Sequence, residues 1–545
     1  MQVSNKKHSS SRQAPRRAVS ALALAVALAA GLAASGCAVN PQPLDRDQIH
    51  DAIEQDQAMM DAMADPITGP LTLDQALARA LKYNLDNRVK LMEEALSERG
   101  FELAKMDMLP VLAARAGYNN RSNVNASSSE SVLTGTQSLE PSTSVDQDRH
   151  YADLELSWNV LDFGVSYLKA KQEADRYLIA ADSRRNVMAK LLQETRTAYW
   201  RAAVTQQLSA RIDGLLEETG AELDRMNEIQ QRRLRSPMDV LQEKRQLLAV
   251  MRSLRSFRRT VDAAQIELAA LINQPPGVHI ELADSEQLPE LPELPVDDLD
   301  TLEQVALAHS SDYTGQLYNA RIAQREARKS LLRLLPGLEF SYGGHYDSNS
   351  YLYNDTWAEA GVRVSWNLLR LLALGDIRAQ NEARDNLVAA RRLAANMATV
   401  ARVNLGWQQY RNALNDLTLS NEFLTIDEQI ADYSGQARSS NAMSGTQTLM
   451  NEARALNSVL TNSLDYVKAQ DAYGGFLFSL GFNPVPENYQ SFDVQALSNR
   501  INTAFAEWTS GPLPIEAGSP WFTENVAGSN QPPLARATDR EAAAQ

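Results

Sequence analysis

Four short segments of the chain alternate between apolar and polar residues with the two-residue period of a β-strand. In the clearest of them the apolar positions, which end near Trp158, share one face, while charged and polar residues share the other. The four segments are residues 111–121, 152–160, 338–346 and 358–368. Such alternation is typical of a transmembrane β-barrel, and equally of a soluble sheet with one face on a core.

Most of the remaining chain has the pattern of long helices. No proline occurs between Pro141 and Pro237 or between Pro336 and Pro484. A helix over residues 165–232 would be about 100 Å long at 1.5 Å per residue. In the segment after Pro237, apolar residues recur every seven positions, which predicts left-handed coiled-coil packing. These residues are Val240, Leu247, Leu254, Val261 and Leu268.

The chain repeats itself at a long interval. The sequence Ser-Trp-Asn occurs at residues 157–159 and again 208 residues later at residues 365–367, and Ser236 and Ser444 repeat at the same offset. Leu-Pro pairs at residues 109–110 and 335–336 precede strand-like segments. A period of this length is too long for a solenoid unit, so it predicts a duplicated half-protein with two strands and two long helices in each copy.

This pattern divides the chain into six regions. The first repeat spans residues 71–274 and opens with an amphipathic helix from Leu73 to about Met108, and the second repeat spans residues 299–485. The remaining regions are a signal peptide at 1–36, a polar tether at 37–70, a proline-rich linker at 275–298 and a partly disordered C-terminal segment at 486–545.

The N-terminus predicts export and a lipid anchor. A basic stretch precedes an Ala/Leu/Val run at residues 18–34, which favours a signal peptide over a retained membrane anchor. The single cysteine, Cys37, follows Ala-Ser-Gly, as in the cleavage box of bacterial lipoproteins. We therefore expect Cys37 to carry lipid, the alternative being a structural free cysteine, and no intrachain disulfide can form.

Charge and residue chemistry exclude several functions. The formal net charge is −15, and removal of residues 1–36, which hold five basic and no acidic side chains, makes the mature chain more negative still. A generally basic surface for nucleic acid is therefore absent. The six histidines are scattered without a His-Glu-x-x-His motif or a cysteine pair, so we expect neither an enzyme nor a metal or cofactor site.

Four strands cannot close a barrel, and an open sheet edge in lipid leaves backbone groups unpaired. Several chains must therefore contribute strands. Two chains would give a nearly filled eight-stranded barrel, and three would give twelve strands with a wider lumen. The long helices would continue from the barrel as a helical tube.

The duplication, the Leu-Pro and Ser-Trp-Asn motifs and the segment Ser-Pro-Met-Asp-Val-Leu from Ser236 resemble the TolC family of outer-membrane channels. The resemblance covers roughly residues 70–485. It implies a mainly α fold with a small β part, namely a coiled-coil helical barrel beneath a twelve-stranded β-barrel shared by a homotrimer. It also implies a protein of the bacterial outer membrane that extends into the periplasm, where it docks a periplasmic adaptor and an inner-membrane pump as a passive export duct. The lipid expected on Cys37 would make this protein lipid-anchored. The alternative is a periplasmic coiled-coil lipoprotein that serves as a scaffold or adaptor.

The resemblance also suggests where the functional residues lie. The turns near residues 232–239 and 440–447 would form the periplasmic gate or the adaptor-docking surface. The alternative is that their charged side chains only lie at solvated helix ends. The family's glycine is replaced by Arg233 and Asn441, of which asparagine better tolerates a left-handed backbone. The other expected residues of this site are Arg235, Ser236, Asp239, Ser444 and Gln447, with Arg235 as the counter-ion of Asp239.

Two tryptophans mark the expected boundary of the membrane. Trp158 and Trp366 each close the apolar face of a strand just before the chain becomes helical. Aromatic girdles are expected at this depth of a transmembrane barrel. The alternative is a pair of buried aromatic side chains in a soluble core.

Overall fold

The computed structural model describes residues 42–63, 65–275, 277–283, 290–291, 299–486 and 488–510. The chain divides into two compact units, residues 1–65 and 66–545. The expected signal peptide, Cys37 and most of the 275–298 linker lie outside the described residues. In the first unit, the segment expected to be only a polar tether contains an exposed helix, α2 (Arg46–Met63).

The second unit contains one four-stranded antiparallel sheet in the order β1-β4-β5-β6. The strands are β1 (Val111–Asn120), β4 (Asp148–Asn159), β5 (Gly337–Asp347) and β6 (Thr356–Ser365). All four predicted strands are therefore confirmed, two from each half of the chain. Within the described residues, β1 and β6 have a partner on one side only. A small excursion between β1 and β4 carries the two-residue strands β2 (Ala126–Ser127) and β3 (Ser142–Thr143).

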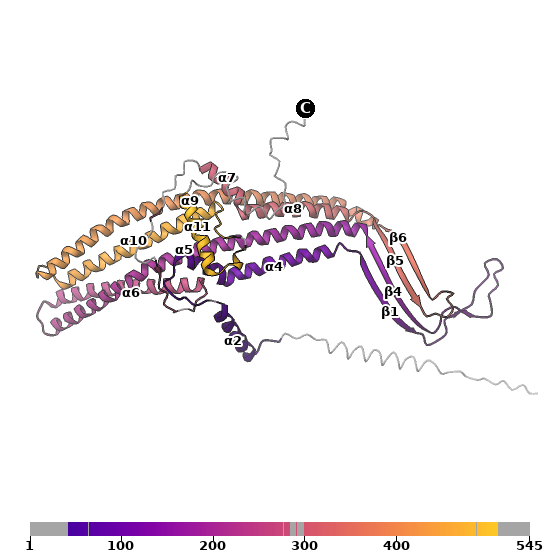
Figure 1. Cartoon of the computed structure of the whole chain (residues 1–545), viewed down its shortest axis with the longest axis horizontal. Helices are drawn as coiled ribbons and strands as arrows, with labels where there is room; N and C mark the ends of the chain where they lie inside the picture. Colours follow the sequence, from indigo (N-terminus) through magenta and orange to yellow (C-terminus); the bar gives the residue numbers. More distant parts are fainter. Residues whose placement is uncertain are drawn as a thin grey trace, which may run out of the picture. The chain divides into compact units, whose positions relative to one another are not determined.

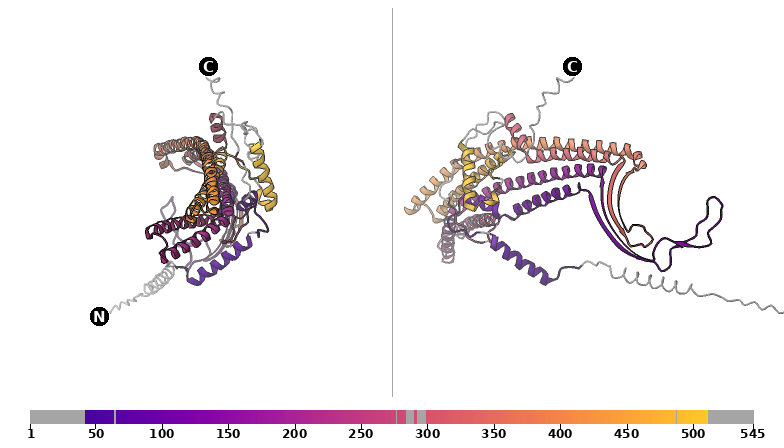
Figure 2. Two further views of the ribbon diagram at one scale, coloured as in Figure 1. Left: turned by 90° about the vertical axis from the view of Figure 1, so that its left-hand side faces the viewer. Right: turned by 45° about the vertical axis from the view of Figure 1, so that its right-hand side comes forward.

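Long helices run side by side from this sheet in the second unit (Figures 1 and 2). The first half contributes α4 (Leu85–Met106), α5 (Val160–Gln231) and α6 (Pro237–Leu271). The second half contributes α8 (Ser311–Leu332), α9 (Leu374–Ser439) and α10 (Gly445–Ser479). Short helices α3 (Leu73–Tyr83), α7 (Leu299–His309) and α11 (Val494–Ser510) pack on them. The 3-10 turn η2 (Leu368–Ala373) lies in the second half, and the 3-10 turn η3 (Tyr489–Ser491) follows it. In Figure 1 the sheet lies at one end of these helices, and the α5–α6 and α9–α10 turns lie at the other.

The predicted coiled-coil seam is the core of the first hairpin. The heptad residues Val240, Leu247, Leu254, Val261 and Leu268 are all buried. Leu247 and Leu254 cluster with Ile212 of α5 and Leu456 of α10, so the seam also joins the two halves. Burial of one such leucine contributes about 1.5–3 kcal/mol relative to its exposure.

The Ser-Trp-Asn motif marks the switch from strand to helix. Asn159 caps α5, because its Oδ1 accepts hydrogen bonds from the backbone N–H groups of Leu161 (3.0 Å) and Asp162 (3.3 Å). Its repeat, Asn367, makes no side-chain cap and is followed by η2 before α9 begins. The two copies therefore leave the sheet differently.

One segment differs from the sequence predictions, and the C-terminal region contains a further helix whose position they did not give. The single helix expected over residues 73–108 is broken at Asn84, whose backbone is extended and whose side chain accepts a hydrogen bond from Asn87 N at 3.1 Å. Asparagine favours such caps over helix interiors. Within the C-terminal region, α11 is an ordered helix whose Leu497 and Ile501 are buried in one cluster with Leu77 of α3.

Candidate functional site

The two hairpin turns have the same backbone geometry. Arg233 and Asn441, 208 residues apart, both adopt left-handed conformations, with φ of 52° and 56°. Each is followed by an N–H group that bonds back into the preceding helix, from Leu234 to Ile229 O (3.1 Å) and from Ala442 to Ala437 O (2.8 Å). The positions predicted to need a left-handed residue are confirmed, although an arginine occupies one of them at a conformational cost.

The two turns differ in how the returning helix begins. Ser444 caps α10, because its Oγ accepts a hydrogen bond from Gln447 N at 3.2 Å. Ser236 makes no side-chain cap, and Pro237 occupies the first position of α6 instead. Proline suits this position because its fixed φ is helical and the position has no N–H partner to lose.

An ion pair at the first turn reaches toward the second hairpin. Arg235 donates two hydrogen bonds to Glu243, from Nη1 to Oε2 (3.1 Å) and from Nη2 to Oε1 (2.7 Å). Hydrogen bonding to Glu243 raises the pKa of Arg235. The buried hydroxyl of Thr446, at the start of α10, lies 3.5 Å from Glu243 Oε2. Glu243 therefore links the tips of both hairpins.

The expected pairing of Arg235 with Asp239 is wrong. Asp239 lies in the first turn of α6, where a negative charge is already favoured by the helix dipole. Glu243 lies one turn farther along the same helix, and the long arginine side chain reaches its carboxylate in a two-bond geometry. Asp239 adds only a weaker Coulombic attraction to Arg235.

A second contact between the hairpins depends on Gly445. A Cβ atom at this position would lie 3.0 Å from Oε1 of Glu222, a residue of α5 that is 4% exposed. Glu222 also accepts a hydrogen bond from Arg225 at 2.7 Å. The absence of a side chain at Gly445 therefore permits α5 to approach the beginning of α10.

Farther from the tips, carboxylates of the two hairpins face each other. Burial, together with the nearby charge of Glu218 on α5, raises the pKa of Glu452 on α10. Arg438 and Arg211 oppose this effect. The contact between the hairpins therefore contains both an attractive and a repulsive electrostatic pair.

The sheet has the reverse of the burial expected for a soluble core. Along β4 the apolar positions are exposed, whereas the polar positions between them are half-buried. The apolar face continues across the sheet through exposed Tyr342, Val362 and Val364. No described element covers this face, so an extended apolar surface stays open in this chain.

Trp158 and Trp366 lie at the helical end of this sheet, and both are exposed. Trp158 contacts Phe163 edge-on, with ring centroids 5.7 Å apart. The indole N–H of Trp366 donates to Leu334 O at 2.9 Å. The exposure of both rings in this chain argues against the alternative of aromatic side chains buried in a soluble core.

Two outer helices carry apolar stripes that sequence reasoning missed. Their side chains are exposed and recur at intervals of three, four or seven residues, which is the spacing of a coiled-coil seam. On α4 the stripe consists of Leu85, Val89, Met92, Leu96 and Leu103, and on α9 of Leu419, Phe423, Ile426, Ile430 and Tyr433. The heptad spacing of these residues in the sequence was the signal that could have revealed the stripes.

The described residues contain no group of three or more acidic, histidine or cysteine side chains placed to hold a metal ion. Nor does any helix in this part of the chain combine the length and the apolar character that crossing a membrane requires.

No protein-family model matches the chain, and no curated protein matches it either. Among solved structures, the Campylobacter jejuni CmeC outer membrane channel is similar with a TM-score of 0.60 at 12% identity, over 79% of this chain and 90% of that one. The outer membrane protein VceC of Vibrio cholerae gives 0.56 at 14% identity, over 75% and 96%. The outer-membrane channel OprN gives 0.58 at 16% identity, over 75% and 89%. The chain therefore has the fold of these channels, and the predicted fold class, mainly helical with a small β part, is confirmed.

Proposed function

We propose that this chain is a passive outer-membrane channel-tunnel of the TolC family, working in a tripartite efflux or secretion system. The observation that carries the proposal is a four-stranded sheet with an uncovered apolar face and two open edges, β1 and β6. In lipid these edges must be paired. Joining β6 of one copy to β1 of the next satisfies them, and three copies close a barrel of twelve strands.

The helical part supports the same assembly. The apolar stripes on α4 and α9 need a partner, and the described part of this chain offers none. The α4 stripe lies near the sheet and the α9 stripe lies near the hairpin tips, so helices of a neighbouring copy would cover the two stripes at different levels of the helical part while the strand edges pair. A head-to-tail contact of this kind closes into a ring when its rotation matches the symmetry.

The hairpin tips would form the periplasmic mouth, because they lie at the end of the helices remote from the sheet (Figure 1). In this proposal the tips close the duct at rest and dock a periplasmic adaptor, which connects the duct to an inner-membrane pump. Arg233, Arg235, Ser236, Asp239, Asn441, Ser444 and Gln447 belong to this mouth.

The export signals complete the proposal. Residues 1–36 would be removed as a signal peptide, and Cys37 would carry lipid and anchor the start of the mature chain to the outer membrane. Mass spectrometry of the mature N-terminus tests this. An unmodified Cys37 would contradict the lipid anchor but would not bear on the proposed channel function.

The deciding experiment combines mass and conductance. We expect native mass measurement of the purified protein to give three chains, and we expect planar bilayers containing it to show single channels. In protein inserted into bilayers, bromine-labelled lipids should quench the fluorescence of Trp158 and Trp366. A protein that gives no conductance and no insertion would support the alternative, a periplasmic coiled-coil lipoprotein acting as a scaffold or adaptor.

A further inference from the structure

A row of four side chains crosses the polar face of the sheet. The strand register places Arg115 opposite Asp153, Asp153 opposite His345, and His345 opposite Trp357. Residues paired across a ladder share a face, so all four project to the side away from the exposed apolar surface. Together they line a depression of about 670 Å³ in the sheet.

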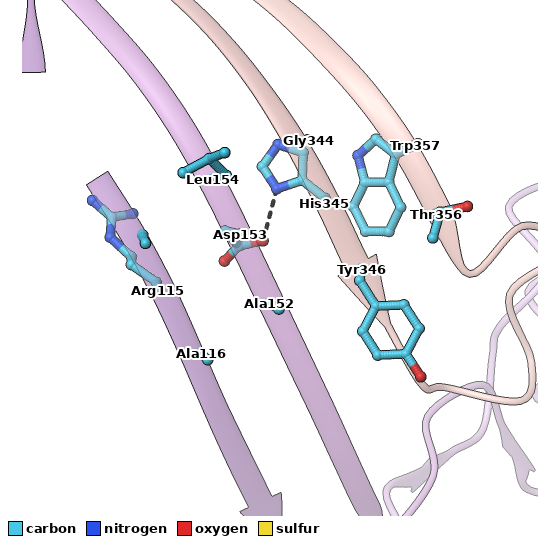
Figure 3. A pocket seen from close by; sticks show the side chains of 11 residues that line it. Arg115, Ala116, Ala152, Asp153, Leu154, Gly344, His345, Tyr346, Thr356 and Trp357 are labelled. Atoms are coloured by element: carbon cyan, nitrogen blue, oxygen red, sulfur yellow. Dashed lines mark hydrogen bonds and ion pairs between the residues drawn. The ribbon is translucent and has the colours of Figure 1, made fainter. Parts of the chain in front are cut away.

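Contacts within this row hold the tryptophan in place. His345 Nδ1 and Asp153 Oδ1 are 2.7 Å apart, and the imidazole stacks on the indole of Trp357 with ring centroids 5.2 Å apart and planes 20° from parallel. Figure 3 shows the three side chains next to one another on β4, β5 and β6. Trp357 nevertheless remains 42% exposed. The indole is therefore oriented in advance and accessible.

The adjacent row has a glycine at its centre. Glu155 pairs with Gly343, and Gly343 pairs with Glu359. A Cβ atom at Gly343 would lie 3.0 Å from His345 Nε2, so the imidazole of His345 occupies the space that a side chain would need. A glutamate therefore stands on each side of this glycine in the row next to Trp357.

The charges of the polar face are not balanced. Its four strands present five acidic residues and three arginines. Each arginine is paired with an acidic residue of the neighbouring strand: Arg115 with Glu155 (3.7 Å), Arg149 with Asp347 (3.2 Å) and Arg363 with Glu339 (3.8 Å). Asp153 contacts His345. Among the described residues, Glu359 forms no ion pair, and it lies two positions from Trp357 on β6, roughly 7 Å along the strand.

We propose that Trp357 and Glu359 form a subsite for amphiphilic organic cations on the wall of the pore. The inference rests on the proposed function, because that function makes the polar face the pore lining. Tryptophan is the best aromatic partner for a cation above its ring, and the unpaired carboxylate adds attraction for positive charge. Three copies around one barrel would form a ring of such subsites, each weak enough to release its cation onward.

The test uses the full-length protein in planar bilayers, with benzyltrimethylammonium as the probe. We expect this cation to block the wild-type channel at lower concentration than benzenesulfonate, an aromatic anion of similar size. Trp357→Leu should raise the half-blocking concentration about tenfold, and Glu359→Gln should raise it several-fold. The matched control is Tyr342→Leu, which removes an aromatic ring from the opposite face of the sheet and should leave block unchanged.

Equal block of wild type, Trp357→Leu and Glu359→Gln, at unchanged conductance in potassium chloride, would overturn the subsite. So would an equal loss of block in Tyr342→Leu. If Trp357→Leu does not insert, the nearly isosteric Glu359→Gln decides, together with Trp357→Phe, which should keep part of the block. Absence of any wild-type channel would refute the proposed function itself. Channels that the cation blocks no better than the anion, and equally in wild type and variants, would refute only the subsite.

Discussion

Replacing Glu243 with glutamine should loosen the closed mouth of the proposed channel. The substitution keeps the size of the side chain but removes the charge that holds Arg235 and faces Thr446 of the other hairpin. In the proposed duct, opening requires the two hairpin tips to move apart. The closed state therefore loses an interaction that the open state does not make.

The structure sets the size of the effect. The contact that crosses between the hairpins is the hydrogen bond from Thr446 to Glu243 Oε2, at 3.5 Å, whereas Arg235 lies on the same hairpin as Glu243. A hydrogen bond contributes about 0.5–1.5 kcal/mol net, and the long distance places this one near the lower end. At about 0.5 kcal/mol per chain, three tips that open together lose about 1.5 kcal/mol, which is roughly tenfold in the opening equilibrium.

Single-channel recording in planar bilayers measures this equilibrium directly as the open probability. Glu267→Gln is the matched control, because Glu267 pairs with Arg201 at 2.6 Å within the first hairpin and does not touch the second. Glu243→Gln should open more often than either wild type or this control. Equal open probability in all three proteins would show that the contact of Glu243 with Thr446 does not restrain the mouth, leaving the tips as a docking surface.

Three further predictions concern stability. Arg233→Gly should stabilise the protein by about 1 kcal/mol in denaturant titration, because φ at this position is 52°; no gain would show that the turn has relaxed. Gly481→Ala should lower the melting temperature, because φ is +88° and a Cβ would lie 2.4 Å from Cβ of His309, whereas Gly220→Ala meets no atom within 4 Å and should not. Glu452→Gln should stabilise the protein at pH 7, because the pKa of Glu452 is raised in the folded protein, and wild type therefore loses stability as the pH rises above the ordinary glutamate pKa of 4.5. Below pH 4.5 the carboxyl group is protonated in both states, so the difference from wild type should vanish there. Parallel pH profiles of the two proteins would contradict this last assignment.

The features predicted correctly from the sequence are those that follow from the local spacing of apolar and polar residues. Alternation located the four strands, and the heptad from Val240 to Leu268 located the buried seam, because each depends only on which face of one element is apolar. The duplication located the turns, since Arg233 and Asn441 occupy the same left-handed position in both copies.

The features that were missed depend on tertiary placement. The pairing of Arg235 with Glu243 rather than Asp239 follows from the path of a long side chain, and two acidic residues one turn apart look alike in sequence. The approach of Glu222 to Gly445 joins residues of different hairpins. The break at Asn84 was overlooked because the amphipathic pattern continues across it on both sides.

The seam between β4 and β5 sets the order in which this chain can fold. β1 and β4 are close in sequence, but β4 pairs with a strand of the second half, so that Asp153 meets His345, 192 residues later. Closing a loop of this length is entropically costly and slow. The first half must therefore hold an unfinished strand edge while the rest of the chain is delivered. An unpaired strand edge is a site at which chains aggregate, so shielding β4 during this interval is what a chaperone would have to do.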